Sequence, residues 1–464
     1  MNYDSILVAE PSLQQARYLK RDQGVAIFMR LEMEMDNPDV AAIEKSVSFF
    51  VSRHESVRTV FPLIEGEVKQ VVLPADERFA IEFVDVNASH KSYEKIRDEY
   101  FESAEIRFVN KQKDPLIKFL LFRLEGQKHM LLMLIDHIIC DGWSMEKIIR
   151  NELMTFYQCY VNGSEPDIGP LKLQLKDYSN QQRAWLSKKR DELSGFWKAK
   201  VSGYNDIFNV GDFYNGYFLR HNRRLSFERT VKKVETQKEL FAIYDCPRAL
   251  LYTNKITGQT FNNIKELAKI SNCTISSIVY ASLHVLLHCY TGKNKTLMMA
   301  IIADRFSSEN QLIIGNLLGE AYFPGEVSDQ LIISDIIEQT FYDILTNCQN
   351  MIIDHDYLHL DRAKLRAASD MVVNYIKHNE NSPDITRLDE KHIDTETNHY
   401  ALKHTACEYD DGFILYWKYN KLLFDKELMG DMVECHKNIL DFMVNNENRT
   451  IGDMKNYFRT LAAV

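Results

Sequence analysis

The chain has 464 residues, of which 45% are hydrophobic and 26% are charged, and its formal net charge is −10. This length exceeds the size at which one hydrophobic core keeps growing, so we expect two domains of roughly 200 residues each. The acidic balance argues against bulk nucleic-acid binding, which usually requires a strongly basic face. The apolar content is ordinary for a globular protein, so the fold needs neither metals nor disulfides as staples.

The cysteines and the N-terminal sequence indicate the cellular compartment of the protein. The eight cysteines are scattered without a CxxC pair or a short metal-binding spacing, so we expect free thiols and no metal site. The N-terminus, MNYDSILVAEPSLQQ, lacks the basic and apolar segments of a signal peptide. No run of 18 apolar residues occurs. These features predict a cytoplasmic protein that does not contact membranes.

The first half of the chain alternates between helix and strand patterns. Asn37-Pro38-Asp39 opens an amphipathic helix that continues to about Arg53. A hairpin, a short strand and a helix follow, at residues 57–73, 80–86 and 93–108. Two apolar runs, 116–124 and 129–135, then predict paired, buried strands. Helices are predicted at 144–160 and 176–200, the second of which would bridge two lobes.

The second half repeats this alternation. Strands are predicted at 224–227, 249–252, 296–302, 371–376 and 412–419. Helices are predicted at 261–270, 275–290, 331–349 and 426–445. Because helices and strands interleave in both halves, the fold class is α/β.

The segment DHIICDGWS follows the second buried strand of the first half. It places Asp136 and His137 where the chain leaves the sheet, a common position for sites in α/β folds. Gly142 lets a ligand approach the backbone, and its N–H near a helix start suits developing negative charge. Ser144 is a natural helix N-cap. Taken alone, the segment also fits a purely structural histidine, whose hydrogen bonds are made within a turn before a capped helix.

Other stretches of the sequence favour a functional interpretation of this pattern. DHIICDGWS resembles HHxxxDGxS, the signature of the condensation domains of nonribosomal peptide synthesis, in the chloramphenicol-acetyltransferase-like superfamily. Further motifs of that family are matched in order along nearly the whole chain. SLQQARYL (12–19) is similar to SxxQxRLxxL, RHESVRTVF (53–61) to RHExLRTxF, LKDYSNQQRAWL (175–186) to YxDYAxWQxxWL, TGKNKTLMMAIIADR (291–305) to TGxxDxxxGxxxxxR, IIGNLLGEAYFPG (313–325) to IGxFVNTLPLR, and WKYNKLLFD (417–425) to YNxxLFD.

The resemblance implies two chloramphenicol-acetyltransferase-like lobes in a V-shaped pseudo-dimer with a central tunnel. We place the N-terminal lobe at residues 1–180 and the C-terminal lobe at 181–464. The resemblance also implies that the chain binds no cofactor itself, because its substrates are presented on the phosphopantetheine of an acyl or peptidyl carrier protein. Since no carrier segment accompanies these lobes, we expect a free-standing enzyme whose carrier acts in trans.

The implied reaction is attack of an amine on the donor thioester, which gives an amide. A neutral imidazole at His137 would accept or orient the amine proton, and Gly142 would assist. Asp141 resembles the family aspartate that pairs with an arginine, for which Arg58 and Arg305 are both candidates. Ser144 and Asn374 are candidate substrate contacts, Asn374 as a contact of the acceptor. The acceptor is either a free small-molecule amine or an amine on a second carrier.

The chain departs from the family pattern at two places. Asp136 replaces the first histidine of the motif, and Gly319-Glu320 stands where Asn-Thr is frequent. Asp136, Asp141 and Ser144 fit the DxxxxDxxS spacing of heterocyclizing relatives, but His137 and Gly142 do not fit those relatives. An aspartate tolerated at a supporting position is the simpler explanation, although a carboxylate beside His137 would raise the pKa of the imidazole unless it points away.

Three other functions compete with amide formation. A degenerate domain would only dock carriers or recruit another enzyme, but such relatives lose the motif histidine. An ester-forming acyltransferase of the plant type would carry a DFGWG element, which this chain lacks. A heterocyclizing enzyme is the third.

Overall fold

A computed structural model describes residues 8–21, 28–88, 91–103, 109–204, 209–221, 249–362, 364–365, 369, 371–377 and 400–462. Within it the chain forms two compact units. Unit 1 comprises Met1–Arg190 and Ala303–Gly319, and unit 2 comprises Asp191–Ile302 and Glu320–Val464. The units thus place 303–319 with the N-terminal part, whereas the expected lobe boundary after residue 180 leaves this segment in the second lobe. The assignment of the two lobes as domains stays a prediction.

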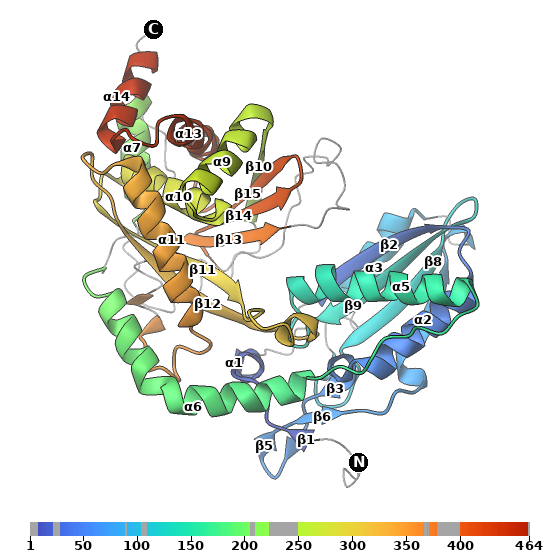
Figure 1. Cartoon of the computed structure of the whole chain (residues 1–464). Helices are drawn as coiled ribbons and strands as arrows, with labels where there is room; N and C mark the ends of the chain where they lie inside the picture. The colour runs from blue at the N-terminus through green and yellow to red at the C-terminus, as the bar shows by residue number, and fades with distance from the viewer. Residues whose placement is uncertain are drawn as a thin grey trace. The chain divides into compact units, whose positions relative to one another are not determined.

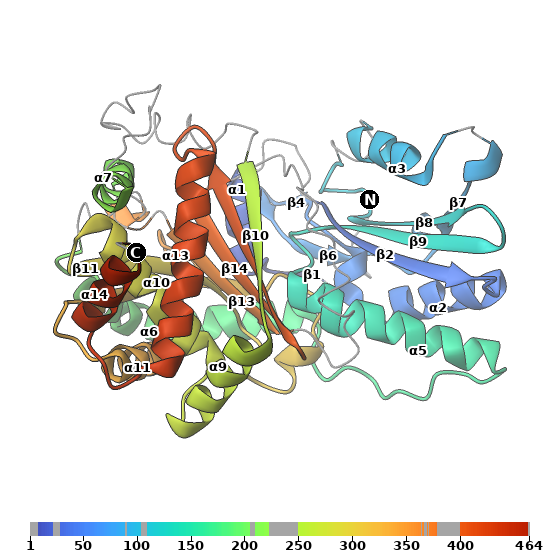
Figure 2. The ribbon, with the colours of Figure 1, turned by 90° about the horizontal axis from the view of Figure 1, so that it is seen from above.

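Unit 1 is built on a four-stranded sheet with helices on both faces (Figure 2). Its strand order is β2-β9-β8-β7, with β7 and β8 parallel and the other pairs antiparallel. Successive residues of a strand face opposite sides, so Leu131 and Met133 join one buried cluster while Leu132 and Leu134 join another. The elements are β2 (Phe28–Asp36), β7 (Ile81–Asp85), β8 (Ile117–Arg123), β9 (Lys128–Asp136), α2 (Val40–Arg53) and α5 (Arg150–Val161) on one face, and α3 (Tyr93–Glu102) on the other.

Two small sheets, several short helical segments and the long helix α6 complete unit 1 (Figure 1). A three-stranded sheet has the order β1-β6-β3, and a two-stranded hairpin lies beside it in the chain. The elements are β1 (Val8–Ala9), α1 (Leu13–Arg21), η1 (Glu55–Arg58), β3 (Thr59–Val60), β4 (Leu63–Ile64), β5 (Glu67–Val68), β6 (Gln70–Val72), η2 (Glu77–Phe79), η3 (Val86–Ala88), η4 (Ser144–Ile149), η5 (Asn310–Leu312) and α6 (Leu175–Lys200), which continues into unit 2.

Unit 2 contains a six-stranded mixed sheet. The strand order is β10-β15-β14-β13-β11-β12, and β13 is parallel to both of its neighbours. Helix α10 is largely buried, and it contacts α7, α9, α11 and α13. The elements are α7 (Val210–His221), β10 (Ala249–Thr257), α9 (Gly258–Ile270), α10 (Ile275–Thr291), β11 (Lys295–Ala303), β12 (Leu318–Glu326), α11 (Ile333–Gln349), β13 (Met371–Lys377), β14 (Leu402–Tyr409), β15 (Gly412–Asn420), α13 (Lys426–Asn445) and α14 (Ile451–Ala462).

The α/β class and most predicted elements are confirmed. The hairpin of apolar runs is β8 paired antiparallel with β9, and Asp39 caps α2 by accepting a hydrogen bond from the Ala42 N–H at 3.0 Å. The predicted helix at 93–108 ends at Glu102 in the structure, beyond which 104–108 lie outside the described residues. The strand predicted at 224–227 also lies outside them.

Several elements were missed by the sequence patterns. β2 carries alternating buried Leu31, Met33 and Met35 between charged residues, so its period-2 signal was present. β12 contains a buried carboxylate, Glu320, and α7 contains Gly216, both of which oppose local propensity. Packing overrides propensity at these positions. α1, β14 and α14 were also not predicted.

Among the described residues, no single helix is long and apolar enough to cross a membrane. α9 and α10 pass a length and composition test only as a pair bent by 108°.

Gly216 is required by the contact between α7 and α10. A Cβ at this position would lie 2.2 Å from the carbonyl oxygen of Tyr290. We therefore expect Gly216→Ala to destabilise the protein by about 1–3 kcal/mol through overpacking. Chemical denaturation followed by circular dichroism would measure the change.

Gly195 on α6 provides a matched helical control, because a Cβ there meets no atom within 4 Å. Gly195→Ala should leave stability unchanged or raise it by about 0.5–1 kcal/mol, since alanine favours helix. Equal effects of the two substitutions would contradict the packing argument.

Candidate functional site

The turn after β9 places His137 at the edge of the sheet. β9 ends at Asp136, whose N–H donates to the Leu116 carbonyl oxygen at 2.8 Å. The Ile139 N–H then donates back to the Asp136 carbonyl oxygen at 3.1 Å, which closes a tight turn. Ile138, Ile139 and Cys140 are fully buried, so the turn is anchored in the core. His137 is the part-buried residue of this run.

One hydrogen bond fixes the tautomer of His137. Its Nδ1 lies 2.6 Å from the carbonyl oxygen of Cys140. A carbonyl oxygen can only accept, so Nδ1 carries the proton and, in the neutral ring, Nε2 carries the lone pair. The ring of Tyr18, from α1, lies against the imidazole with a centroid distance of 5.7 Å. The geometry thus provides a preoriented acceptor at Nε2.

The Asp136 carboxylate contacts the backbone of the turn and the side chain of Lys111. Its Oδ1 accepts a hydrogen bond from the Ile138 N–H at 2.9 Å, and its Oδ2 lies 3.5 Å from the Nζ of Lys111. Both Asp136 and Lys111 are buried, and burial raises the pKa of the Asp136 carboxyl while Lys111 opposes the rise. The carboxylate contacts partners other than the imidazole. This arrangement agrees with a supporting role for Asp136.

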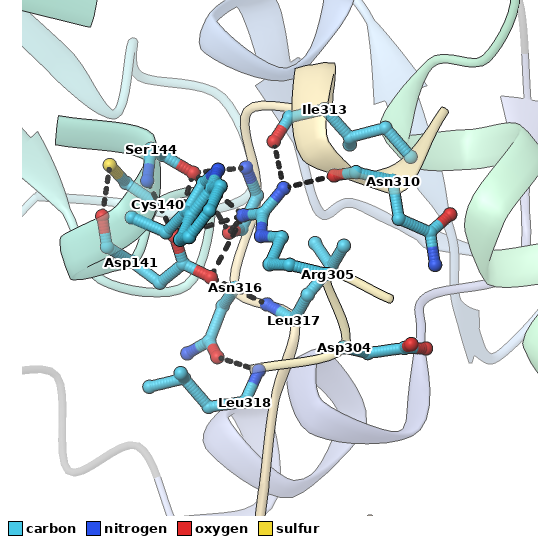
Figure 3. A network of polar contacts seen from close by, with 12 residues as sticks. Cys140, Asp141, Ser144, Asp304, Arg305, Asn310, Ile313, Asn316, Leu317 and Leu318 are labelled. Atoms are coloured by element: carbon cyan, nitrogen blue, oxygen red, sulfur yellow. Dashed lines mark hydrogen bonds and ion pairs between the residues drawn. The ribbon is translucent and has the colours of Figure 1, made fainter. Parts of the chain in front are cut away.

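Asp141 pairs with Arg305, the second of the two candidate arginines (Figure 3). The Nη2 of Arg305 lies 2.9 Å from both carboxylate oxygens, and both side chains are buried. The same guanidinium donates through Nη1 to the carbonyl oxygens of Asn310 and Ile313. The pair therefore ties the turn after β9 to the segment that follows β11.

Arg58, the other candidate, has different partners. Its Nε donates to the Val51 carbonyl oxygen at 2.9 Å, and its Nη1 donates to the carbonyl oxygen of Leu73. Arg58 thus joins the end of α2 to the residue that follows β6. Of the two candidates, Arg305 and not Arg58 is the partner of Asp141, and a place for Arg58 at the active site stays a prediction.

Ser144 is not the N-cap that the sequence predicts. The Ser144 N–H donates to the Oδ1 of Asp141 at 2.8 Å, so the aspartate caps this turn. The Ser144 hydroxyl lies 2.8 Å from Asp141 Oδ1, 3.0 Å from Arg305 Nη2 and 3.1 Å from the Gly315 nitrogen. Ser144 is fully buried, and its hydroxyl contacts protein groups. A direct contact with substrate stays a prediction.

The chain after Asp141 continues in an unusual helical form. Residues Ser144–Ile149 form a π-helical segment, η4, which passes into α5. π-helical turns inside α-helices frequently lie at functional sites. The position of η4 directly after the motif agrees with that tendency.

Gly142 is exposed, and the protein itself does not demand a glycine there. A Cβ at Gly142 would meet no atom within 4 Å, and its φ is not in the left-handed region. Packing and backbone strain therefore do not explain the residue. A ligand contact at Gly142 stays a prediction.

Two residues of the segment 315–318 reach the turn and were missed by the sequence analysis. The Nδ2 of Asn316 donates to the His137 carbonyl oxygen at 2.9 Å, and the Leu317 N–H donates to Asp141 Oδ2 at 3.2 Å. Gly315 lies beside them, where a Cβ would be 2.5 Å from Leu175 Cδ1 and would make that side chain move. The matched motif IGxFVNTLPLR pointed to this segment but did not specify these contacts.

Other motif residues contact one another within unit 1. Ser12 and Gln15 make a reciprocal capping box at the start of α1. Gln182 of α6 accepts from the Leu13 N–H at 3.0 Å and donates to Tyr178, whose hydroxyl donates to Asp304 at 3.0 Å. Residues from distant parts of the sequence thus hold one another within unit 1.

His54 is a structural histidine. It lies buried with Nε2 2.6 Å from Glu152, and burial lowers its pKa although Glu152 opposes this. Cys140 is equally buried, and burial raises the pKa of its thiol, which keeps the sulfur protonated. Neither residue provides a reactive group. No group of three or more potential metal ligands occurs in the described ranges.

Asn374 lies in unit 2, apart in the chain from the other candidates. It is half-buried on β13, opposite Thr405 of β14. Its role as an acceptor contact stays a prediction. Glu320 is buried on β12, 3.4 Å from Arg362 and 3.6 Å from His355.

The Asp141–Arg305 pair generates a test by double-mutant cycle. Asp141→Asn and Arg305→Met should each destabilise the protein by about 3–5 kcal/mol, because each leaves a buried charge without its counter-ion. The double variant should lose much less than the sum. Denaturant unfolding of the four proteins measures the coupling.

Arg58→Met is the matched control for this cycle. Its effect should add to that of Asp141→Asn within about 0.5 kcal/mol, since the two residues share no contact. Additivity between positions 141 and 305 would contradict the assigned pairing.

The chain is similar to a protein family and to several known proteins. Residues 19–457 match the family model described as Condensation domain. The linear gramicidin synthase of Brevibacillus parabrevis contains a polypeptide that is 24% identical over 442 residues, which cover 89% of this chain and 8% of that polypeptide. Bacitracin synthase 1 of Bacillus licheniformis is 23% identical over 456 residues, which cover 96% of this chain and 8% of that protein. The chain thus spans about 8% of the length of these relatives.

Solved structures share the fold at low sequence identity. The X-domain from teicoplanin biosynthesis matches with a TM-score of 0.72 and 18% identity, covering 96% of both chains. The condensation domain from the Monacolin K polyketide synthase MokA matches with a TM-score of 0.72 and 13% identity, covering 97% of this chain and 100% of that one. These likenesses establish the chloramphenicol-acetyltransferase-like α/β fold. With a family model matched across nearly its whole length, the chain belongs to the condensation domain family.

Proposed function

We propose that the chain forms an amide by transferring an acyl or aminoacyl group from a carrier-bound thioester to an amine. The observation that carries the proposal is the hydrogen bond from His137 Nδ1 to the Cys140 carbonyl oxygen, which leaves Nε2 as the lone-pair nitrogen. Such a nitrogen suits the acceptance of a proton from an amine at neutral pH. The bond also prevents the ring from presenting the wrong tautomer.

The chemistry balances without a cofactor on this chain. The amine nitrogen attacks the thioester carbonyl carbon, the C–S bond breaks, and the amine proton passes to Nε2. The imidazolium then returns the proton to the departing phosphopantetheine thiolate, which gives an amide and a free thiol. Because a thioester is already activated, holding the reactants in line supplies much of the rate, about 7–11 kcal/mol. His137 and Gly142 are the residues that we assign to the reacting atoms.

The donor in this proposal is carried on phosphopantetheine by an acyl or peptidyl carrier protein, acting in trans. The acceptor is a free small-molecule amine or an amine on a second carrier. The family supports the carrier, and the exposed face of Gly142 supports close approach of a bulky acyl group. We do not assign Asp136 to heterocyclization, because its carboxylate is buried, with Oδ1 accepting from the Ile138 N–H and Oδ2 lying 3.5 Å from Lys111.

Substitution of His137 tests the assigned base. Aminoacyl thioesters of phosphopantetheine-loaded carriers would be mixed with a panel of amines, and amide products would be measured by mass spectrometry. We expect His137→Ala to lower kcat by about 10²–10⁴-fold, the usual value of a positioned acid–base group. The matched control is His129→Ala at the other end of β9, which should keep full turnover.

Unchanged amide formation by His137→Ala would overturn the assigned centre. Absence of turnover by the wild type with every amine, together with retained carrier binding, would instead favour a docking or recruitment domain. Ester or heterocycle products from the same thioesters would point to the corresponding relatives.

Gly142→Ala separates a ligand contact from a folding role. The new Cβ meets no protein atom, so thermal stability should not fall. Turnover should fall by roughly 10- to 100-fold, because the methyl group displaces the reacting carbonyl from its aligned position. Gly169→Ala, which also adds a Cβ in open space, is the control and should retain activity. Full activity of Gly142→Ala would remove this residue from the site.

A further inference from the structure

We propose that Asn316 is a positioning residue for His137, which rests on the function proposed above. The assignment starts from geometry: Asn316 is 2% exposed, and its Nδ2 donates to the carbonyl oxygen of His137 at 2.9 Å. Its Oδ1 accepts from the Leu318 N–H at 3.2 Å. Both ends of the amide are therefore used, which fixes its orientation.

The contact complements the Asp141–Arg305 pair. The turn that carries the imidazole begins at His137 and ends at Asp141. Arg305 holds the Asp141 end, where Nη2 also lies 3.1 Å from the Gly315 carbonyl oxygen. Asn316, the next residue after Gly315, holds the His137 end. One short segment thus clamps both ends of the turn.

These contacts bear on the orientation of His137 Nε2, the nitrogen that accepts the proton in the proposed reaction. The bond between His137 Nδ1 and the Cys140 carbonyl oxygen spans three residues of the same turn. Its geometry depends on the peptide plane after His137, whose oxygen Asn316 holds. Loss of the amide donor would leave that buried oxygen unsatisfied and let the peptide rotate. The imidazole would then lose its fixed direction and tautomer.

Asn316 occupies the unspecified position of the matched pattern IGxFVNTLPLR. The pattern therefore does not demand an amide here. In this chain Asn316 fills that position and contacts His137, and Asp136 replaces the first histidine of the motif. Asn316 touches no reacting atom in the proposed mechanism, so it acts through His137.

Two variants test the assignment. Asn316→Asp keeps the acceptor for the Leu318 N–H but replaces the donor by a carboxylate oxygen that repels the His137 carbonyl. Asn316→Ser removes the reach of the donor without adding charge. The matched control is Asn151→Asp on α5, whose Nδ2 likewise donates to a backbone carbonyl, that of Lys147, at 3.0 Å.

The first measurement is the tautomer of His137 by ¹⁵N NMR of histidine-labelled protein, with the signal assigned by its loss in His137→Ala. The wild type and Asn151→Asp should have the proton on Nδ1. Both Asn316 variants should have a mixture of tautomers. The second measurement is amide formation, for which kcat should fall roughly 10- to 100-fold with KM nearly unchanged.

The outcomes separate this inference from the proposed function. An unchanged His137 tautomer in both folded Asn316 variants would overturn the positioning role, whatever the turnover. An altered tautomer with turnover that does not depend on His137 would keep the positioning role and overturn the proposed base. Circular dichroism identifies a variant that has not folded, and the other variant then decides.

Discussion

The buried ion pair between Asp141 and Arg305 is the constraint on which the rest of the site depends. It joins two segments 164 residues apart in sequence, and it does so where water is excluded. A buried charge pair is costly to form unless its remaining hydrogen-bonding groups are satisfied. Here Ser144, Leu317 and the carbonyl oxygen of Gly315 supply partners for the carboxylate and for Nη2, whereas the Nε of Arg305 has no hydrogen-bond partner among the described residues. The turn bearing His137 is consequently fixed by electrostatics at one end and by the sheet at the other.

In the proposed amide formation, this fixed turn contributes alignment of the reactants and one directed proton transfer. A thioester needs little activation, so an enzyme of this kind gains most by aligning two reactants and directing one proton. The protein supplies a single tautomer through Cys140 and an exposed backbone at Gly142. Asp136 has no part in the proposed proton transfer. Its carboxylate lies with Lys111 and the turn, and the supporting role of this position stays a prediction.

Much of this architecture could be predicted from the sequence, and the failures have physical causes. Periodicity predicted α2, β8 and β9 because each buries one face or both faces in a regular pattern. The sequence could name His137 and Asp141 but could not choose between Arg58 and Arg305, since both arginines lie far from Asp141 along the chain and only folding brings one to it. Asp141 is the cap in place of Ser144 because the helical backbone already begins at residue 142, so Asp141 precedes it and accepts from the Ser144 N–H. Asn316 was missed because a single amide contact across distant segments leaves no periodic signal.

The central claim is that Nε2 of His137 faces a place that a pantetheine-borne group can reach. Incubation with bromoacetyl-pantetheine, followed by peptide mass spectrometry, tests this most directly, because an accessible lone pair displaces the bromide and retains the adduct. The account predicts an adduct on the imidazole of His137 and none on the neighbouring buried Cys140. Labelling confined to other residues, with His137 untouched, would contradict it.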